Sequence, residues 1–159
     1  MRPTITPTQL VDRALITDLV HEYCRALDAM ELNALVALFT DDCVVEYGPT
    51  ISSHGACALR HDLGRMWRWA RTAHHTSSNV LVRFADADTT LITSAVWAWH
   101  EAPDGHTATA TGQYHDTVVR TADGWRIAAR RQVLTGNDAG FTVDIHPMPR
   151  KADERTAAR

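Results

Sequence analysis

The side chains best suited to chemistry are Tyr23, Asp28 and one histidine of the pair His74-His75. A histidine held by a carboxylate is a common acid–base device, because the imidazole titrates near neutral pH. A phenol beside it can donate a hydrogen bond to an oxygen on which negative charge develops. Where these groups meet, they suit the removal of a proton next to a carbonyl or hydroxyl and its return elsewhere on the substrate.

Asp28 and Tyr23 each allow two interpretations. Residues 28–31 read Asp-Ala-Met-Glu, which is capping-box spacing, so Asp28 either starts a second helix or enters a site. On a straight helix Asp28 lies ~140° around the axis from Tyr23. Its place near the helix end, where the chain turns, is what allows both residues to reach one site. Tyr23 is either a core tyrosine with a bonded hydroxyl or a phenol that faces a pocket.

The two histidines open a predicted strand, in which alternation sends their rings to opposite faces. His75 shares its face with Ser77 and Asn79, and His74 takes the other face. We predict that His75 is the catalytic histidine and that Asn79 contributes to substrate binding. The choice between His74 and His75 stays open.

Other aromatic residues are candidates for substrate binding. Trp97 and Trp99 share one strand face. Facing inward, they would form a flat wall for a ring-containing ligand; the alternatives are core packing and a subunit interface. Tyr114 lies on the following strand, and Tyr47 could add a second phenol to the site.

One arginine is also a candidate. Arg131 lies on an otherwise apolar strand face, where it either orients a substrate oxyanion or pairs with a carboxylate such as Asp116. Arg126 and Arg130 are expected in solvent. The chain has no HExxH, phosphate-loop, dinucleotide or GxSxG motif. Nine histidines invite a metal, yet no two have helical ligand spacing beside a carboxylate. We therefore predict neither a metal nor a cofactor.

The elements that must position these residues follow from periodicity. Apolar residues at helical spacing predict helices first, and period-two runs joined by short turns predict an antiparallel meander afterwards, which is an α+β arrangement. A capping box at Thr6 to Gln9 starts the first helix. We expect one domain over 1–146 and a poorly ordered tail over 147–159. The predicted helices are 7–29, 33–39 and 55–72, and the predicted strands are 43–48, 51–54, 74–84, 89–101, 106–120 and 124–135.

Composition narrows the class of protein. The chain has 159 residues, a formal net charge of −3 and no basic stripe, so nucleic acid is not an expected partner. No apolar run reaches the ~20 residues of a membrane span, and the first residues lack signal-peptide character. Three cysteines without CxxC spacing are expected as free thiols. These features predict a cytoplasmic protein.

Three blocks carry a resemblance to a known family: YCRALDAMELNALVALFTDDCVVEYG over 23–48, HHTSSN over 74–79 and GQYHDTVVRTADGWRIAARR over 112–131. The chain resembles the SnoaL-like branch of the NTF2-like superfamily, with its scytalone dehydratase-like and bile-acid dehydratase-like proteins. The resemblance implies a cone-shaped α+β fold, with three N-terminal helices packed on a curved, mainly antiparallel sheet that encloses a pocket. In such dehydratases and isomerases a Tyr-x4-Asp motif, matched here by residues 23–28, places its acid at the pocket. A histidine matched by His75 pairs with that acid.

The resemblance implies a cofactor-independent lyase or isomerase: a dehydratase, double-bond isomerase or cyclase that acts on a small, apolar, oxygenated substrate. The composition, rich in Ala, Arg and Thr, suits a high-GC bacterium, where such domains often serve secondary metabolism or catabolism. The alternative is a non-catalytic ligand-binding or assembly subunit, similar to the small subunit of ring-hydroxylating dioxygenases. A limonene-type epoxide hydrolase would carry an Arg-x-Asp pair on a middle strand, and residues 94–100 contain no acid, which argues against that activity. Apolar side chains on the outer sheet face predict a homo-oligomer. The resemblance implies a dimer or trimer.

Overall fold

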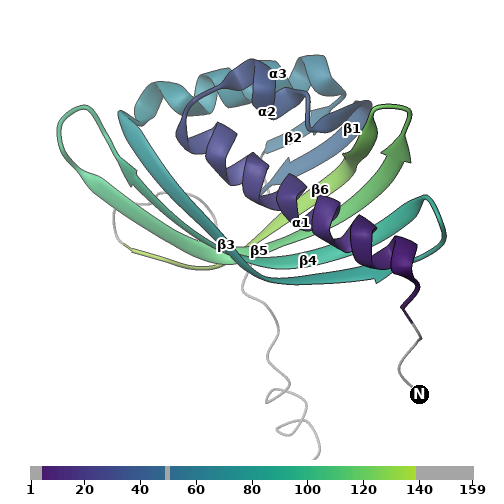
Figure 1. Cartoon of the computed structure of the whole chain (residues 1–159). Coiled ribbons are helices and arrows are strands. Elements are labelled where there is room, and N and C mark those ends of the chain that lie inside the picture. Colours follow the sequence, from purple (N-terminus) through teal and green to yellow (C-terminus); the bar gives the residue numbers. More distant parts are fainter. Residues whose placement is uncertain (1–4, 49–50, 139–159) are drawn as a thin grey trace, which may run out of the picture.

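Three helices lie in the hollow of one curved sheet in the computed structural model, which describes residues 5–48 and 51–138 (Figure 1). The expected α+β cone is therefore confirmed. The helices are α1 (Pro7–Asp28), α2 (Leu32–Val36) and α3 (Ala56–Met66), followed by a 3-10 turn (Trp67–Trp69). The strands are β1 (Phe39–Tyr47), β2 (Ile51–His54), β3 (Thr72–Phe84), β4 (Thr89–Glu101), β5 (Thr107–Thr121) and β6 (Gly124–Asn137).

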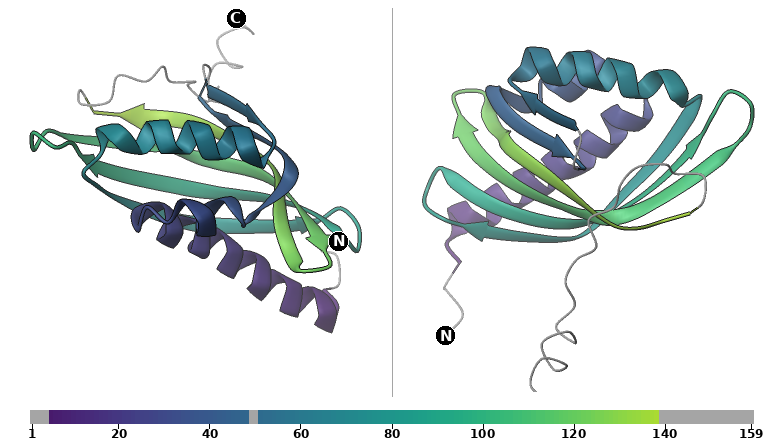
Figure 2. Two further views of the ribbon diagram at one scale, coloured as in Figure 1. Left: turned by 90° about the horizontal axis from the view of Figure 1, so that it is seen from above. Right: turned by 180° about the vertical axis from the view of Figure 1, so that it is seen from behind.

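The sheet has the strand order β2-β1-β6-β5-β4-β3. Strands β3 to β6 form the predicted antiparallel meander, and β1 joins β6 in the one parallel pairing among the described residues. The two further views show α1 running along the concave side while α3 covers the hollow near β1 and β2 (Figure 2). The sheet does not close into a barrel.

Helix α1 begins as its sequence predicts. The Thr6 hydroxyl accepts from the Gln9 amide, and the Gln9 side chain accepts from the Thr6 amide, which completes the capping box. Asp28 does not cap α2: the N-cap of that helix is Glu31, with no side-chain cap. The second capping box was therefore a wrong alternative, and Asp28 is left available for another contact. Strand β1 begins at Phe39, earlier than predicted, because Phe39 already pairs with Ile127 of β6.

Bulges change which side chains face the hollow, and two of the register shifts bear on predicted site residues. In β6 the register passes from Thr117–Ala129 to Val118–Ile127, so Ala128 is an extra residue. In β3 the register shifts between Ser78 and Leu81. An extra residue inverts the alternation beyond it, so a face predicted by period two is correct on only one side of each bulge.

The core lies between α1 and the concave face of the sheet. Its helix contribution includes Ile16, Leu19 and Val20, and its strand contribution includes Val96 and Ile127. Within the described residues no helix is long and apolar enough to cross a membrane. The tail predicted for residues 147–159 lies outside the described part of the chain.

Candidate active site

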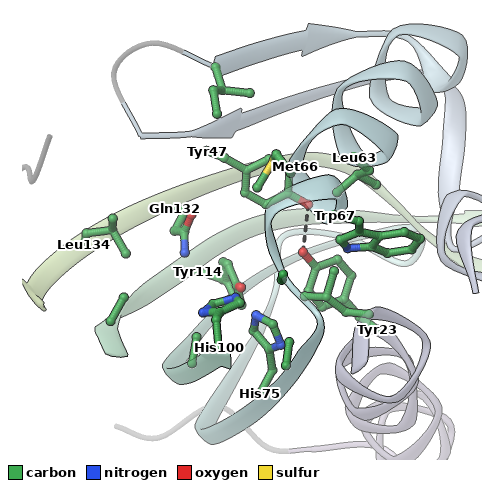
Figure 3. A pocket seen from close by; sticks show the side chains of 16 residues that line it. Tyr23, Tyr47, Leu63, Met66, Trp67, His75, His100, Tyr114, Gln132 and Leu134 are labelled. Carbon is green, nitrogen blue, oxygen red and sulfur yellow. Dashed lines mark hydrogen bonds between the residues drawn. The ribbon is translucent and has the colours of Figure 1, made fainter. Parts of the chain in front are cut away.

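A cavity of about 270 Å³ lies between α1, α3 and the concave sheet face, and side chains from both layers reach it (Figure 3). The wall toward α3 is apolar. The imidazoles come from β3 and β4, and the phenols come from α1, β1 and β5. Small residues at Ala98 and Ala110 leave the space that larger side chains would fill. The lining residues are Tyr23, Leu27, Tyr47, Ile51, Leu63, Met66, Trp67, Ala70, Ala73, His75, Ala98, His100, Ala110, Tyr114, Gln132 and Leu134.

His75 and Asp28 meet at the edge of this cavity. The Nδ1 of His75 lies 2.7 Å from Oδ1 of Asp28, and the His75 backbone N–H donates to Oδ2 at 3.0 Å. The His75 side chain is only 7% exposed. Because an ionised carboxylate only accepts, the contact places the proton on Nδ1 and leaves Nε2 with the free lone pair. The pair is therefore arranged as an imidazole base, His75, that is held in orientation by the carboxylate of Asp28.

The side chain of His74 lies outside the cavity. Its side chain is 65% exposed, and its Nδ1 lies 3.5 Å from Oδ2 of Asp28 without lining the cavity. Its ring packs edge-on against Trp97 at 6.2 Å between centroids. The strand phase chosen from sequence, with His75 inward, agrees with this placement.

Three phenols share the cavity wall. The hydroxyls of Tyr23 and Tyr47 are 2.7 Å apart, which is the dashed contact in Figure 3. The Tyr114 ring meets the Tyr23 ring edge-on at 5.7 Å between centroids. Burial raises the pKa of Tyr23, and it raises the pKa values of Tyr47 and Tyr114 well above the usual range. The phenols stay protonated near neutral pH and act as hydrogen-bond donors rather than bases.

The buried arginine is Arg130, not Arg131. Its Nε and Nη2 donate to the two oxygens of Asp116 at 2.8 and 2.7 Å, with both side chains fully buried. Arg131 is 64% exposed and lies 3.8 Å from Glu46 on the other face. The bulge at Ala128 explains the error, since it turns Arg130 inward where unbroken alternation placed Arg131.

Three other predicted binding residues also lie away from the cavity. Trp97 is 42% exposed on the outer face of β4, and Trp99 shares that face by alternation and does not line the cavity. Asn79 is exposed and occupies the β3 bulge with φ of 51°, a left-handed conformation that Asn tolerates. On β3 the cavity is lined instead by Ala73 and His75, and on β4 by Ala98 and His100.

His100 also lines the cavity, although we did not select it from sequence. Its ring meets the His75 ring edge-on at 5.0 Å between centroids. Burial, and then the charge of His75, lower the pKa of His100 to about 4. At neutral pH it is therefore an uncharged imidazole. The alternation of β4 could have identified it, because His100 lies on the face opposite to Trp97 and Trp99.

The charge pattern of the site is simple. None of the lining residues is Asp, Glu, Lys or Arg. Among the described residues, no group of three or more His, Cys, Asp or Glu side chains is placed to hold a metal ion. The chemistry that the arrangement can perform is proton transfer by His75 beside phenol donors.

Comparison with known proteins identifies a family and several similar structures. The model of the SnoaL-like domain family matches residues 8–131. Among solved structures, the chain is similar to a "putative scytalone dehydratase" from Novosphingobium aromaticivorans, with 28% identity and a TM-score of 0.85. That match covers 90% of this chain and 97% of the other. No curated protein matches the chain by sequence.

Two further structures share the fold. A hexachlorocyclohexane dehydrochlorinase from Novosphingobium barchaimii is 17% identical with a TM-score of 0.73, over 87% of this chain and 97% of that one. The beta subunit of a "putative aromatic-ring-hydroxylating dioxygenase" from Novosphingobium aromaticivorans is 16% identical with a TM-score of 0.70, over 80% and 91%. At these identities the likeness concerns the fold alone, and a fold does not fix a function.

Proposed function

Because this chain belongs to the SnoaL-like domain family and carries a cavity-facing histidine–aspartate pair, we propose that it is a cofactor-free lyase or isomerase. The reaction class is dehydration, double-bond shift or ring closure. The observation that carries the proposal is the 2.7 Å contact between His75 Nδ1 and Asp28 Oδ1 at the edge of the cavity. A buried imidazole oriented by a carboxylate meets the geometric requirement for general acid–base catalysis.

The proposed mechanism, written for a dehydration, uses three side chains. Nε2 of His75 takes a proton from the carbon next to a carbonyl, and Asp28 stabilises the imidazolium that forms. The negative charge that moves to the carbonyl oxygen is stabilised by a hydrogen bond from the Tyr23–Tyr47 phenol pair, in which one hydroxyl donates to the other and the second proton is left for the substrate. The electrons then return to form the carbon–carbon double bond as the β-hydroxyl leaves. His75 gives its proton to that hydroxyl, so that water departs.

The cavity also indicates the class of substrate. Since no permanently charged side chain lines it, a carboxylate or phosphate inside would lose hydration without a counter-charge. Polar contacts come from imidazole, phenol and amide groups, while Leu63, Met66 and Trp67 offer apolar surface. We therefore propose a neutral, mostly apolar molecule with at least one carbonyl or hydroxyl oxygen.

Proton transfer can be tested before the natural substrate is known. A panel of neutral β-hydroxycyclohexanones in D₂O reports α-proton exchange by NMR and enone formation by absorbance. We expect the protein to accelerate exchange, and His75→Ala to lose about 10²–10⁴-fold of that rate. His74→Ala is the matched control, because the neighbouring histidine is exposed and outside the cavity, and it should retain the rate.

Other outcomes decide between the alternatives. A folded His75→Ala variant with full activity contradicts the proposal, and loss confined to His74→Ala assigns the role to the other histidine. Binding of the panel, measured by calorimetry, without exchange in any variant would identify a ligand-binding module instead. Such a module has no need for an aspartate-oriented imidazole, which is why the enzyme is favoured.

We further propose a homo-oligomer that forms through the outer face of the sheet. Leu81, Leu91 and Trp97 are large apolar side chains about half exposed on the neighbouring strands β3 and β4. Exposed apolar surface of this kind marks interfaces. Light scattering at micromolar concentration should give a dimer or trimer mass, and Trp97→Glu should shift it to the monomer. A monomeric mass for the unaltered chain contradicts this proposal.

A further inference from the structure

All three tyrosines of the chain belong to one cluster around one buried cation. The chain contains Tyr23, Tyr47 and Tyr114 and no other tyrosine, and each lines the cavity. The guanidinium carbon of Arg130 lies 3.8 Å from the centroid of the Tyr23 ring and 4.2 Å from that of Tyr114. Arg130 itself does not line the cavity, so its charge acts on the phenols from behind.

Arg130 is fixed by contacts that leave it little freedom. Asp116 holds its Nε and Nη2 in a two-point pairing, and the two residues are direct cross-strand partners on β5 and β6. Phe39 adds a third ring at 5.9 Å from the guanidinium carbon. A guanidinium that stacks on aromatic faces is attracted to them, and this attraction is strongest away from water.

We propose that Arg130 is a positioning residue: its cation fixes the Tyr23 and Tyr114 rings from behind and strengthens the Tyr23–Tyr47 pair as a hydrogen-bond donor to a substrate oxygen. This inference rests on the proposed function, since it assigns the source of donor strength in the same site. Stacking orients the Tyr23 ring so that its hydroxyl meets that of Tyr47. A positive charge beside a phenol also favours loss of its proton, which makes the O–H a stronger donor.

The electrostatic balance agrees with the geometry. Burial raises the pKa of Tyr23, and the charge of Arg130 opposes that rise. The same opposition from Arg130 acts on Tyr47 and Tyr114, although burial prevails in both and raises their pKa values. Without the cation, the phenols would be weaker donors in the same apolar surroundings.

The pair can be removed without leaving a buried charge. Arg130→Met combined with Asp116→Leu replaces both partners by apolar side chains, a change that buried ion pairs often tolerate. Arg130→Lys keeps the charge but loses the planar stack. The matched control is Arg120→Met combined with Asp12→Leu. That pair also joins an arginine, an aspartate and an aromatic ring, but it lies on Trp125 and outside the tyrosine cluster.

The readout uses the tyrosines themselves. With 3-fluorotyrosine incorporated throughout, every ¹⁹F signal comes from this cluster, and the fluorine lowers the intrinsic phenol pKa toward an accessible pH. We expect the Arg130→Met/Asp116→Leu variant to raise the Tyr23 phenol pKa by about 1–3 pH units, the range for an opposite charge nearby. Arg130→Lys should give a smaller rise, and the Arg120→Met/Asp12→Leu control should leave all three signals unchanged.

Activity gives the second readout. On the β-hydroxycyclohexanone panel, loss of the pair should lower kcat about tenfold with little change in KM, which is less than the ~10²–10³-fold of losing a donor outright. Arg130→Lys should recover most of kcat. Unchanged ¹⁹F titration in the charge-free variant overturns the proposal. Where no phenol titrates before unfolding, equal kcat losses in the Lys and Met/Leu variants overturn it.

The two proposals fail separately. If His75→Ala keeps full activity while the ¹⁹F titration moves as expected, the acid–base mechanism is wrong and Arg130 still tunes the phenols. If His75→Ala is inactive while the titration is unmoved, the mechanism stands and Arg130 has only a structural role.

Discussion

The two ends of helix α1 each carry a buried or half-buried aspartate that reaches a strand, yet they differ in what the strand offers. Near the start, Asp12 accepts from Nη2 of Arg120 at 2.7 Å and from Nε1 of Trp125 at 3.1 Å. At the last residue, Asp28 accepts from Nδ1 of His75 at 2.7 Å. The two carboxylates accept hydrogen bonds of the same length, but the donor is a guanidinium at Asp12 and an imidazole at Asp28.

The donor decides what each aspartate can do. Arg120 is always protonated, and its hydrogen bond lowers the pKa of Asp12 despite burial, so that cluster has no proton to exchange near neutral pH. His75 is an imidazole, the side chain that acid–base catalysis uses most often, and it lines the cavity. The first arrangement fixes the helix to the sheet. The second is the one to which we assign catalysis.

The largest expected effect comes from removing the charge at the cavity end. Asp28→Asn keeps the shape of the side chain but does not stabilise an imidazolium, so proton exchange on the β-hydroxycyclohexanone panel should fall by about 10²–10⁴-fold. Urea unfolding should change by less than about 1 kcal/mol, because Asp28 is partly exposed. Full activity in a folded Asp28→Asn variant would remove the distinction between the two ends.

The next effect is a pH dependence of stability that comes from His100 at the cavity end. Burial, and then the charge of His75, lower the pKa of His100 from 6.5 to about 4. Between these values the unfolded chain binds a proton that the folded chain does not, so stability rises with pH across that window. The contribution is up to about 3 kcal/mol. Urea unfolding at pH 4.5 and pH 7 measures it.

The control for this prediction is His100→Gln, which does not titrate. Its stability should depend on pH less steeply than that of the unaltered chain between pH 4 and 6.5, while the contribution from Asp12 stays common to both. Equal slopes in the two proteins would show that His100 titrates normally in the fold.

The comparison also shows what sequence could predict. Local signals were sufficient at the helix start, where Thr6 and Gln9 satisfy each other within one turn. They were sufficient for the meander, because each turn carries its own chemistry. The meeting of Asp28 with His75 was predicted from alternation and from the resemblance, and the structure places the two side chains in contact.

Two of the errors, those at Asn79 and Arg131, share one physical cause. A bulge adds one residue without disturbing the composition of the strand, so period two cannot detect it. Asn79 occupies one bulge, and the exchange of Arg130 for Arg131 follows from another. The Asp116–Arg130 pair depends on cross-strand register, which only the folded sheet provides. For β4 the choice of face was open, because both faces carry large aromatic or imidazole side chains.

At the start of α1 we expect the opposite of the Asp28→Asn result: replacing Asp12 should lower stability and leave activity nearly unchanged. Asp12→Ala leaves the Trp125 indole N–H and the Arg120 guanidinium without their buried acceptor, which should cost about 1–3 kcal/mol in urea unfolding. Exchange activity at 25 °C should stay within about twofold, since none of these residues lines the cavity. A large loss of activity in the folded variant would mean that the two ends are coupled through the helix.

The smallest effect concerns the first turn of α1. Thr6→Ala removes the hydroxyl that accepts from the Gln9 amide and should cost about 1 kcal/mol. Thr6→Ser keeps the hydroxyl and is the matched control, with an expected change of a few tenths of a kcal/mol. Because the cap is exposed and Asp12 joins the helix to the sheet within the next two turns, the loss should appear as faster amide exchange near Leu10.

The amides near Tyr23 should be unaffected. Hydrogen exchange measured along the helix separates the two cases. Faster exchange over the whole of α1 would contradict the role given to Asp12, since the helix would then depend on its cap rather than on the cluster that joins it to the sheet.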